Sequence, residues 1–362
     1  MIGGFLGAGK TTLIARLARH YLDSGQTVGV ITNDQADNLV DTAHLRSLGF
    51  VVGEVAGSCF CCNFDELIAV ADSLGTEQIP DLLLAEPVGS CTDLVATIVR
   101  PMQSILGDRF DVAPFGVLLK PSHGTRILSG QRSGFSPQAE YIFRKQLEEA
   151  DYLMIGRADA LSVQQIAELT IRLSELVERT PVVAVSPKTG RGIDEVIRQI
   201  QRPTEVAGRS LDIDYDIYAA GEAEMGWVNA TAVIDTDEPL PLDQAIEQLV
   251  ASIAEGLHRH GGEIAHLKAS VSGGGTMAIA NVVARDHGVQ IGLPSNRSVT
   301  DRLELVVNAR VILDPGVMQT IVDEQIDRWT RRYSLTLLSS ASRNLRPGRP
   351  IPTHRIPATT PQ

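Results

Sequence analysis

The first residues of the chain contain glycines, a lysine and a threonine at the spacing of a phosphate-binding loop. Residues 4–11 (GFLGAGKT) match the pattern GxxxxGK[ST] of a phosphate-binding loop. Glycines let the backbone N–H groups approach phosphate oxygens, and the helix that follows directs its positive end at the same phosphates. Lys10 supplies a cation to the β- and γ-phosphates, and the Thr11 hydroxyl is a ligand for Mg²⁺. The predicted nucleotide-binding residues of this loop are Gly4, Gly7, Ala8, Gly9, Lys10, Thr11 and Thr12.

A second reactive cluster lies at residues 57–63 (GSCFCCN), where Cys59, Cys61 and Cys62 offer three sulfur ligands. Thiolates prefer Zn²⁺, Co²⁺, Ni²⁺ or Cu⁺ to Mg²⁺. The chain contains no further CxxC pair, so the ligand set is short of the four that a structural zinc site uses. An incomplete set suits a metal that is picked up and released. Redox thiols and buried small side chains are the alternatives. Cys91 is a candidate further sulfur donor, but a lone cysteine at a helix start more often serves in packing.

Two carboxylates follow apolar runs that read as buried strands. Asp34 comes after residues 26–32 (QTVGVIT), and Glu86 comes after residues 81–85 (DLLLA). In open α/β sheets ligands bind at this carboxyl edge, so both are predicted to hold Mg²⁺ directly or through water. Gly89 would let the backbone approach the γ-phosphate. The predicted catalytic residues are therefore Lys10, Asp34 and Glu86, although Glu86 can equally belong to a capping turn.

The elements that must position these residues alternate between strands and helices over residues 1–201. This pattern predicts an α/β fold with a doubly wound, mostly parallel sheet. Only Met1 and Ile2 precede the phosphate loop, so we expect either a truncated chain start or a first strand that is reduced to a stub. Expected helices include residues 92–105 and residues 162–180 with Ser162 as the N-cap, and residues 121–135 read as a mobile loop.

A second pattern follows a linker at residues 202–213. Residues 214–341 predict a smaller α+β domain with strands near 214–221, 225–235, 263–271, 276–286 and 303–313 and helices at 242–259 and 315–333. Residues 342–362 contain many prolines and arginines and no aromatic residue, which predicts a disordered tail.

Composition narrows the class of protein. A net charge of −12 and a pI near 5.2 argue against a nucleic-acid or membrane-surface partner. No apolar run approaches the ~20 residues that span a bilayer. These features favour the cytoplasm, where thiols stay reduced and clustered cysteines indicate metal or thiol chemistry.

Four motifs together resemble the CobW-type P-loop GTPases, relatives of the urease and hydrogenase accessory GTPases. GGFLGAGKTT is similar to the family's phosphate loop, GSCFCCN to its GCxCC segment, and LLAEPVG to its hhhExxG motif. Residues 146–151 (QLEEAD) are similar to the QxxxAD run before its guanine-reading strand. The resemblance implies a slow GTPase that acts as a metallochaperone, with GTP, Mg²⁺ at Thr11 and Glu86, and Zn²⁺ or Co²⁺ at Cys59, Cys61 and Cys62. It also implies a metal-receiving client enzyme as partner, and it leaves a homodimer open.

The chain departs from the family at the guanine motif NKxD, which reads Gly156-Arg157-Ala158-Asp159. Asp159 can still accept the guanine N–H groups, and Arg157 can stack on the base. Gly156 has no side chain for the base, so an ATPase of the same fold is an alternative. Ser186, at the end of the strand near 181–186, completes the predicted nucleotide site. A GTP-dependent activator of a corrinoid enzyme, with structural cysteines, is the other alternative.

Overall fold

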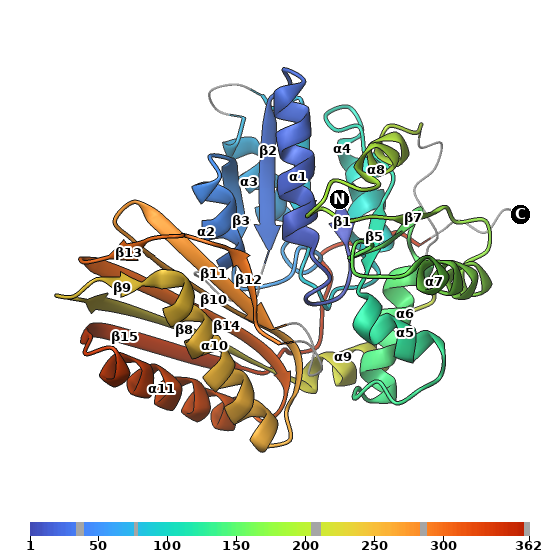
Figure 1. Ribbon diagram of the computed structural model, residues 1–362. Coiled ribbons are helices and arrows are strands. Elements are labelled where there is room, and N and C mark those ends of the chain that lie inside the picture. The colour runs from blue at the N-terminus through green and yellow to red at the C-terminus, as the bar shows by residue number, and fades with distance from the viewer. Residues whose placement is uncertain (34–39, 76–78, 204–210, 283–287, 358–362) are drawn as a thin grey trace, which may run out of the picture. The chain divides into compact units, whose positions relative to one another are not determined.

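Figure 1 shows the computed structural model, which describes residues 1–33, 40–75, 79–203, 211–282 and 288–357. The chain divides into two compact units. Of the described residues, the first unit contains 1–33, 48–75, 79–203, 211–221 and 349–357, and the second contains 40–47, 222–282 and 288–348. Within these ranges no helix combines the length and the apolar character needed to cross a membrane.

Every strand pair in the first unit is parallel, as the alternation of strands and helices predicts. The strands form sheets of the order β3-β2-β4 and β1-β5-β6-β7, and β1 also contacts β4. Their bounds are β1 Ile2–Gly3, β2 Val28–Asn33, β3 Val51–Val55, β4 Leu82–Glu86, β5 Gly116–Leu119, β6 Tyr152–Ile155 and β7 Val182–Ala184. The predicted α/β class is therefore confirmed.

The helices of this unit connect successive strands and pack on them through apolar faces. Ser162 caps α7 as expected, because its hydroxyl accepts from Gln165 N while the Gln165 side chain accepts from Ser162 N. The helix bounds are α1 Lys10–Asp23, α3 Phe64–Ser73, η1 Val95–Val99 (a π-helix), α4 Arg100–Leu106, α5 Pro121–Leu128, α6 Pro137–Glu148, α7 Val163–Leu176, α8 Ile193–Ile200 and α9 Tyr215–Ala223.

Two expectations for the first unit need correction. The predicted helix at 92–105 begins only after Asp93, whose φ of 63° is left-handed and incompatible with a helical turn. The predicted loop at 121–135 contains α5 instead. Pro121 occupies the first turn of α5, where its fixed φ is favourable and its missing N–H costs nothing.

The second unit is an antiparallel sheet with two long helices on one face (Figure 1). The strand order is β12-β11-β10-β14-β8-β15. The helices α10 (Leu242–Arg259) and α11 (Pro315–Arg332) cover the sheet, and Trp329 Nε1 of α11 donates to Ala245 O of α10 at 2.8 Å. The strand bounds are β8 Met225–Asp235, β9 Leu240–Pro241, β10 Glu263–Gly273, β11 Thr276–Val282, β12 Gln290–Leu293, β13 Ser298–Val299, β14 Arg302–Ile312 and β15 Thr336–Leu345.

A short helix from the N-terminal part of the chain also belongs to this second unit. In α2 (Val40–Ser47) the backbone N–H of Val40 donates to Asn308 Oδ1 of β14 at 3.0 Å, and Asp41 pairs with Lys268 of β10. Asn308 and Lys268 alternate along their strands with residues of the apolar core, so they lie on the sheet face opposite α10 and α11. The segment after β2 is thus followed by a helix that packs with the second unit.

The boundary and the tail differ from the sequence prediction. Residues 214–221 form most of α9 rather than a strand, because Asp214 Oδ1 accepts from Asp216 N and Ile217 N and starts the helix. The disordered tail predicted from residue 342 is wrong for the residues described. They complete β15, which pairs with β8, and residues 349–357 hydrogen-bond within the first unit. Most of the predicted linker lies outside the described residues.

Candidate nucleotide and metal site

The phosphate loop adopts a conformation that only glycine allows at its key positions. Gly4, Gly7 and Gly9 have φ values of 133°, 71° and 101°. A Cβ on Gly4 would lie 2.4 Å from Leu118 O, so no side chain fits there. Helix α1 begins directly at Lys10. The first backbone N–H groups of α1 have no partner within the helix and can bind an anion.

Three polar side chains lie side by side beneath this loop. Lys10 Nζ donates to Gly4 O at 3.0 Å and lies 3.9 Å from Glu86 Oε1. Thr11 Oγ1 donates to the same Glu86 oxygen at 3.1 Å. All three are buried. The structure therefore brings together the cation and the two oxygen ligands predicted for a phosphate–Mg²⁺ site, while Thr12 is exposed.

The predicted base-reading residues lie on neighbouring loops. Ala158 N donates to Val185 O at 3.1 Å, and Arg191 Nη1 donates to Ala158 O at 2.9 Å, which joins the loop after β6 to the loop after β7. Asp159 is exposed and Ser186 is fully buried. A Cβ on Gly156 would lie 3.1 Å from Leu119 O, so an asparagine at this position would be crowded.

The three clustered cysteines form a compact sulfur triangle. The turn closed by Cys62 N and Asn63 N on Cys59 O folds the segment back on itself. The Cys59 sulfur lies 3.1 Å from those of both Cys61 and Cys62, and the other two are 3.8 Å apart. Cys59 and Cys61 are buried, and Cys62 is partly exposed. This is the one group of possible metal ligands found among the described residues.

Hydrogen bonds among the three thiols shift their pKa values in opposite directions. Hydrogen bonds from Cys61 and then Cys62 hold the pKa of Cys59 well below its usual value. The same contact with Cys59 raises the pKa of Cys61 and raises that of Cys62 to about 11. The cluster therefore favours a single thiolate before a cation arrives, and a bound cation would displace the remaining protons.

Asn33, the last residue of β2, holds the cysteine segment in place. Its Nδ2 donates to Val55 O at 2.9 Å and to Ser58 O at 2.7 Å, and its Oδ1 accepts from Phe60 N at 2.8 Å. Thr32, one residue earlier, lies opposite Glu86 in the β2–β4 pairing. The end of one strand thus contacts the cysteine segment and neighbours Glu86, the predicted Mg²⁺ ligand.

The C-terminal segment of the first unit runs over the same cluster. Ile351 N donates to Cys62 Sγ at 3.3 Å, and Thr353 N donates to Cys61 O at 2.8 Å. Arg355 Nε lies 2.7 Å from Asp93 Oδ2. Residues expected to be disordered therefore cover the most exposed thiol of the cluster.

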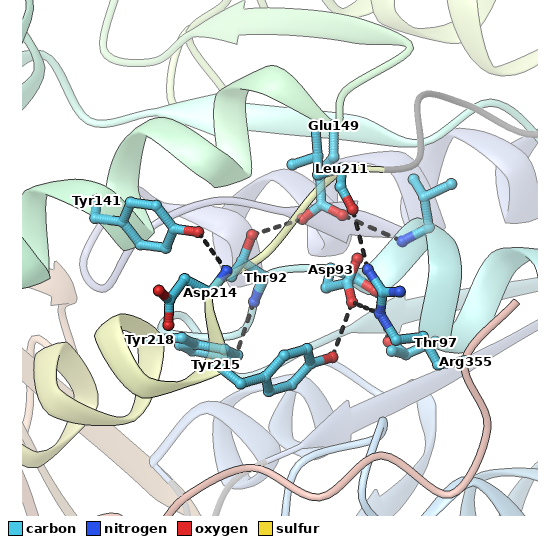
Figure 2. A network of polar contacts seen from close by, with 11 residues as sticks. Thr92, Asp93, Thr97, Tyr141, Glu149, Leu211, Asp214, Tyr215, Tyr218 and Arg355 are labelled. Atoms are coloured by element: carbon cyan, nitrogen blue, oxygen red, sulfur yellow. Dashed lines mark hydrogen bonds and ion pairs between the residues drawn. The ribbon is translucent and has the colours of Figure 1, made fainter. Parts of the chain in front are cut away.

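A buried polar network holds the segment that follows Glu86 (Figure 2). The Tyr218 hydroxyl accepts from Thr92 N at 3.2 Å, and Glu149 accepts from Thr92 Oγ1 at 3.3 Å and from Val95 N at 3.2 Å. Burial raises the pKa of Glu149 to about 8. Asp93 accepts from the Tyr215 hydroxyl at 2.8 Å as well as from Arg355.

A glutamine beside this network reaches the same segment. Gln146 Nε2 donates to Gly89 O at 2.9 Å and to Cys91 O at 2.8 Å. A Cβ on Gly89 would lie 2.8 Å from Leu6 N, so Gly89 packs directly against the phosphate loop. The glutamine therefore ties the end of α6 to the residues expected to sense the γ-phosphate.

The structure brings several of the predicted site residues together through contacts that the sequence analysis did not anticipate. Asp34 lies outside the described residues, so its predicted role stays a prediction. The sequence analysis assigned no role to Asn33, Gln146 or Glu149. Gln146 was nevertheless detectable, because it falls on the apolar stripe of α6 beside Ala139, Ile142 and Phe143. A polar residue on such a stripe indicates a buried hydrogen-bonding partner.

The first half of the chain is similar to a known family of nucleotide-binding domains. The model of the CobW/HypB/UreG nucleotide-binding domain matches residues 1–184. The zinc chaperone YeiR of Escherichia coli (strain K12) is 30% identical over 166 residues, 44% of this chain and 46% of that protein. The zinc chaperone CobW of Sinorhizobium sp is 25% identical over 216 residues, 52% and 58% of the two chains. The chain spans about half the length of the curated relatives it matches. The Zn(II)-bound YjiA GTPase from E. coli aligns with a TM-score of 0.38 and 15% identity, over 90% of this chain and 97% of that one.

Proposed function

The chain belongs to the CobW/HypB/UreG family of nucleotide-binding domains, and from this premise we propose that it is a GTP-hydrolysing metallochaperone. It binds a transition metal at Cys59, Cys61 and Cys62 and delivers the metal to a client enzyme. The observation that carries this proposal is the sulfur triangle held by Asn33, at the end of the strand that pairs with β4. The zinc chaperone relatives support Zn²⁺ as the cargo.

In the present structure Lys10 donates to a backbone carbonyl, and a nucleotide phosphate can replace that partner. Backbone N–H groups of residues 7–12 receive the β- and γ-phosphates, and Lys10 exchanges Gly4 O for a phosphate oxygen. Thr11 and Glu86 would hold Mg²⁺, which would neutralise charge on the phosphates, and Asp34 is proposed to join them directly or through water. Arg157, Asp159 and Ser186 contact the base.

Hydrolysis itself needs positioning and charge stabilisation rather than a covalent intermediate. Water attacks the γ-phosphorus, the bond from that phosphorus to the β–γ bridging oxygen breaks, and GDP and inorganic phosphate leave. Lys10 and the N–H groups of the loop stabilise the charge that develops on the transferred phosphoryl group. Gly89 lies against the phosphate loop. Loss of the γ-phosphate would shift the turn that carries Gly89, and this shift would alter the geometry of the cysteine segment.

The test separates the two halves of the proposal with two variants. We expect wild-type protein to bind about one Zn²⁺ per chain, Cys61→Ser to lose it, and Lys10→Ala to keep the metal but lose GTP turnover. Competition between GTP and ATP tells whether the Gly156–Asp159 motif still selects guanine. Wild-type protein that binds no stoichiometric metal, with Cys61→Ser lowering only its thermal stability, would contradict the metallochaperone and favour structural cysteines.

A further inference from the structure

Residues 349–357, here called the strap, contact the cysteine cluster without forming a helix or a strand. Ile351 N donates to Cys62 Sγ at 3.3 Å. Two residues further on, Thr353 N donates to Cys61 O at 2.8 Å, and the Thr353 hydroxyl donates to Cys62 O at 3.2 Å. One hydrogen bond of the strap thus ends on the sulfur of a predicted metal ligand, and two others hold the backbone that carries the cluster.

Two ion pairs fasten the strap to the first unit on either side of these bonds. Arg355 Nε lies 2.7 Å from Asp93 Oδ2, and its Nη2 donates to Leu211 O at 3.0 Å (Figure 2). Arg349, near the other end, pairs with Asp216, but both side chains are exposed and such pairs contribute little. The Asp93 side chain is 1% exposed, so its carboxylate depends on the guanidinium for charge compensation. Arg355 is therefore the main anchor of the strap.

Apart from this anchor, the strap is attached by few contacts. The Ile351 side chain is 75% exposed, and residues 353, 355 and 357 are exposed as well. The strap therefore buries little apolar surface, and segments with few buried contacts open locally at a low free-energy cost. Its three prolines restrict the released chain, so release gains less conformational entropy and the strap can dock again.

We propose that the strap is a displaceable cover of the metal site, which shields Cys62 when docked and exposes it for metal transfer when released. This inference rests on the proposed function, because the strap would regulate metal exchange at the three clustered cysteines.

The chemistry of Cys62 suits such a cover. A client ligand must reach the cation while the chain still holds it, and Cys62 is the partly exposed member of the triangle. A backbone N–H can donate to a thiolate as well as to a thiol, so the docked strap is compatible with a bound cation. The anchor Asp93 lies four residues after Gly89, which packs against the phosphate loop. The strap is thus fastened to the segment that is expected to respond to the γ-phosphate.

The experiment loosens the strap in the full-length protein. Arg355→Ala removes the anchor, and Thr353→Pro removes both the N–H and the hydroxyl that bind the cysteine segment. The matched controls are Arg132→Ala, at an exposed arginine of the same unit outside the strap, and Thr353→Ser, which keeps both donors. Circular dichroism reports the folding of each variant.

Two rates are then measured. The first is the reaction of Cys62 with a maleimide in the metal-free protein, located by mass spectrometry. The second is the transfer of Zn²⁺ from the loaded protein to a chromophoric chelator. We expect both rates to rise by about tenfold or more in Arg355→Ala and in Thr353→Pro, because the lost hydrogen bonds set the population of the open strap. Both controls should keep the wild-type rates.

Wild-type rates in either strap variant would overturn the inference and leave the proposed function intact. A faster maleimide reaction without faster transfer of Zn²⁺ would overturn it as well, because the strap would then shield the thiol without controlling the metal. A wild-type protein that takes up no stoichiometric Zn²⁺ would overturn both the inference and the proposed function.

Discussion

Replacing Asn33 with alanine tests whether the end of β2 controls the metal loop. The side chain is 7% exposed and makes three hydrogen bonds to Val55 O, Ser58 O and Phe60 N, between 2.7 and 2.9 Å long. Alanine removes all three and leaves the buried N–H of Phe60 without its acceptor. The cysteine segment then loses the contacts that fix it before the metal arrives.

The magnitude follows from these contacts. Each hydrogen bond contributes about 1 kcal/mol net, so their loss amounts to about 3 kcal/mol. Metal binding must then supply the ordering of the loop, and about 3 kcal/mol corresponds to a Zn²⁺ affinity about 100-fold weaker. Affinity falls by less where the loop keeps part of its order, so this value is an upper bound.

The assay is competition for Zn²⁺ against a chromophoric chelator, with thermal unfolding measured in parallel. Asn63→Ala is the matched control, because Asn63 lies in the same segment and its side chain makes no capping hydrogen bond at the start of α3. We expect the control to bind Zn²⁺ like the wild type. A wild-type affinity in Asn33→Ala would refute the argument that Asn33 organises the metal loop.

Three further predictions follow from the same contacts. Gly89→Ala places a Cβ 2.8 Å from Leu6 N, so GTP turnover should fall by about 100-fold or more, as steady-state kinetics would show; turnover near that of the wild type would contradict the close approach. Glu149, with its pKa raised by burial to about 8, keeps a proton in the folded protein that the unfolded chain releases near its ordinary value of 4.5. Its contribution to stability is therefore lost as pH rises from about 5 to about 8. Glu149→Gln should remove that part of the slope of melting temperature against pH. Equal slopes in the variant and the wild type would contradict the raised pKa of Glu149. Arg355→Ala leaves the buried Asp93 without its cation, so chemical denaturation should show a loss of about 1–3 kcal/mol, which Arg355→Lys partly restores; an unchanged midpoint would argue against the ion pair.

Much of the nucleotide site could be predicted because its chemistry depends on short spacings. The phosphate loop needs glycines at fixed offsets before Lys10, and Glu86 follows an apolar run that could only be a buried strand. The cysteine cluster was visible for the same reason. Each of these signals is local, so one sequence is sufficient to read it.

The connections between these motifs could not be read in that way. Asn33 contacts the cysteine segment across a distance in sequence that no periodicity encodes. Composition alone predicted disorder for residues 342–362, because composition reports only the order that comes from burial of apolar side chains. Among the described residues, 342–345 pair with β8 instead. Ile351, Thr353 and Arg355 hydrogen-bond to Cys62, Cys61 and Asp93.

Residues 214–221 were expected to form a strand, and tyrosine and isoleucine do favour strands in general. They form a helix instead, because Asp214 Oδ1 accepts hydrogen bonds from Asp216 N and Ile217 N. Asp214, directly before Tyr215 at the start of α9, was the available signal, and it competed with an equally plausible strand pattern.

The central claim is that nucleotide state and metal binding are coupled through the first unit. The most direct measurement is the Zn²⁺ affinity of the wild-type protein with GDP and with a non-hydrolysable GTP analogue, under the same chelator competition. We predict affinities that differ by at least about fivefold, the lower end of a typical coupling free energy. Equal affinities in the two nucleotide states would contradict the account, whatever the number of sulfurs around the metal.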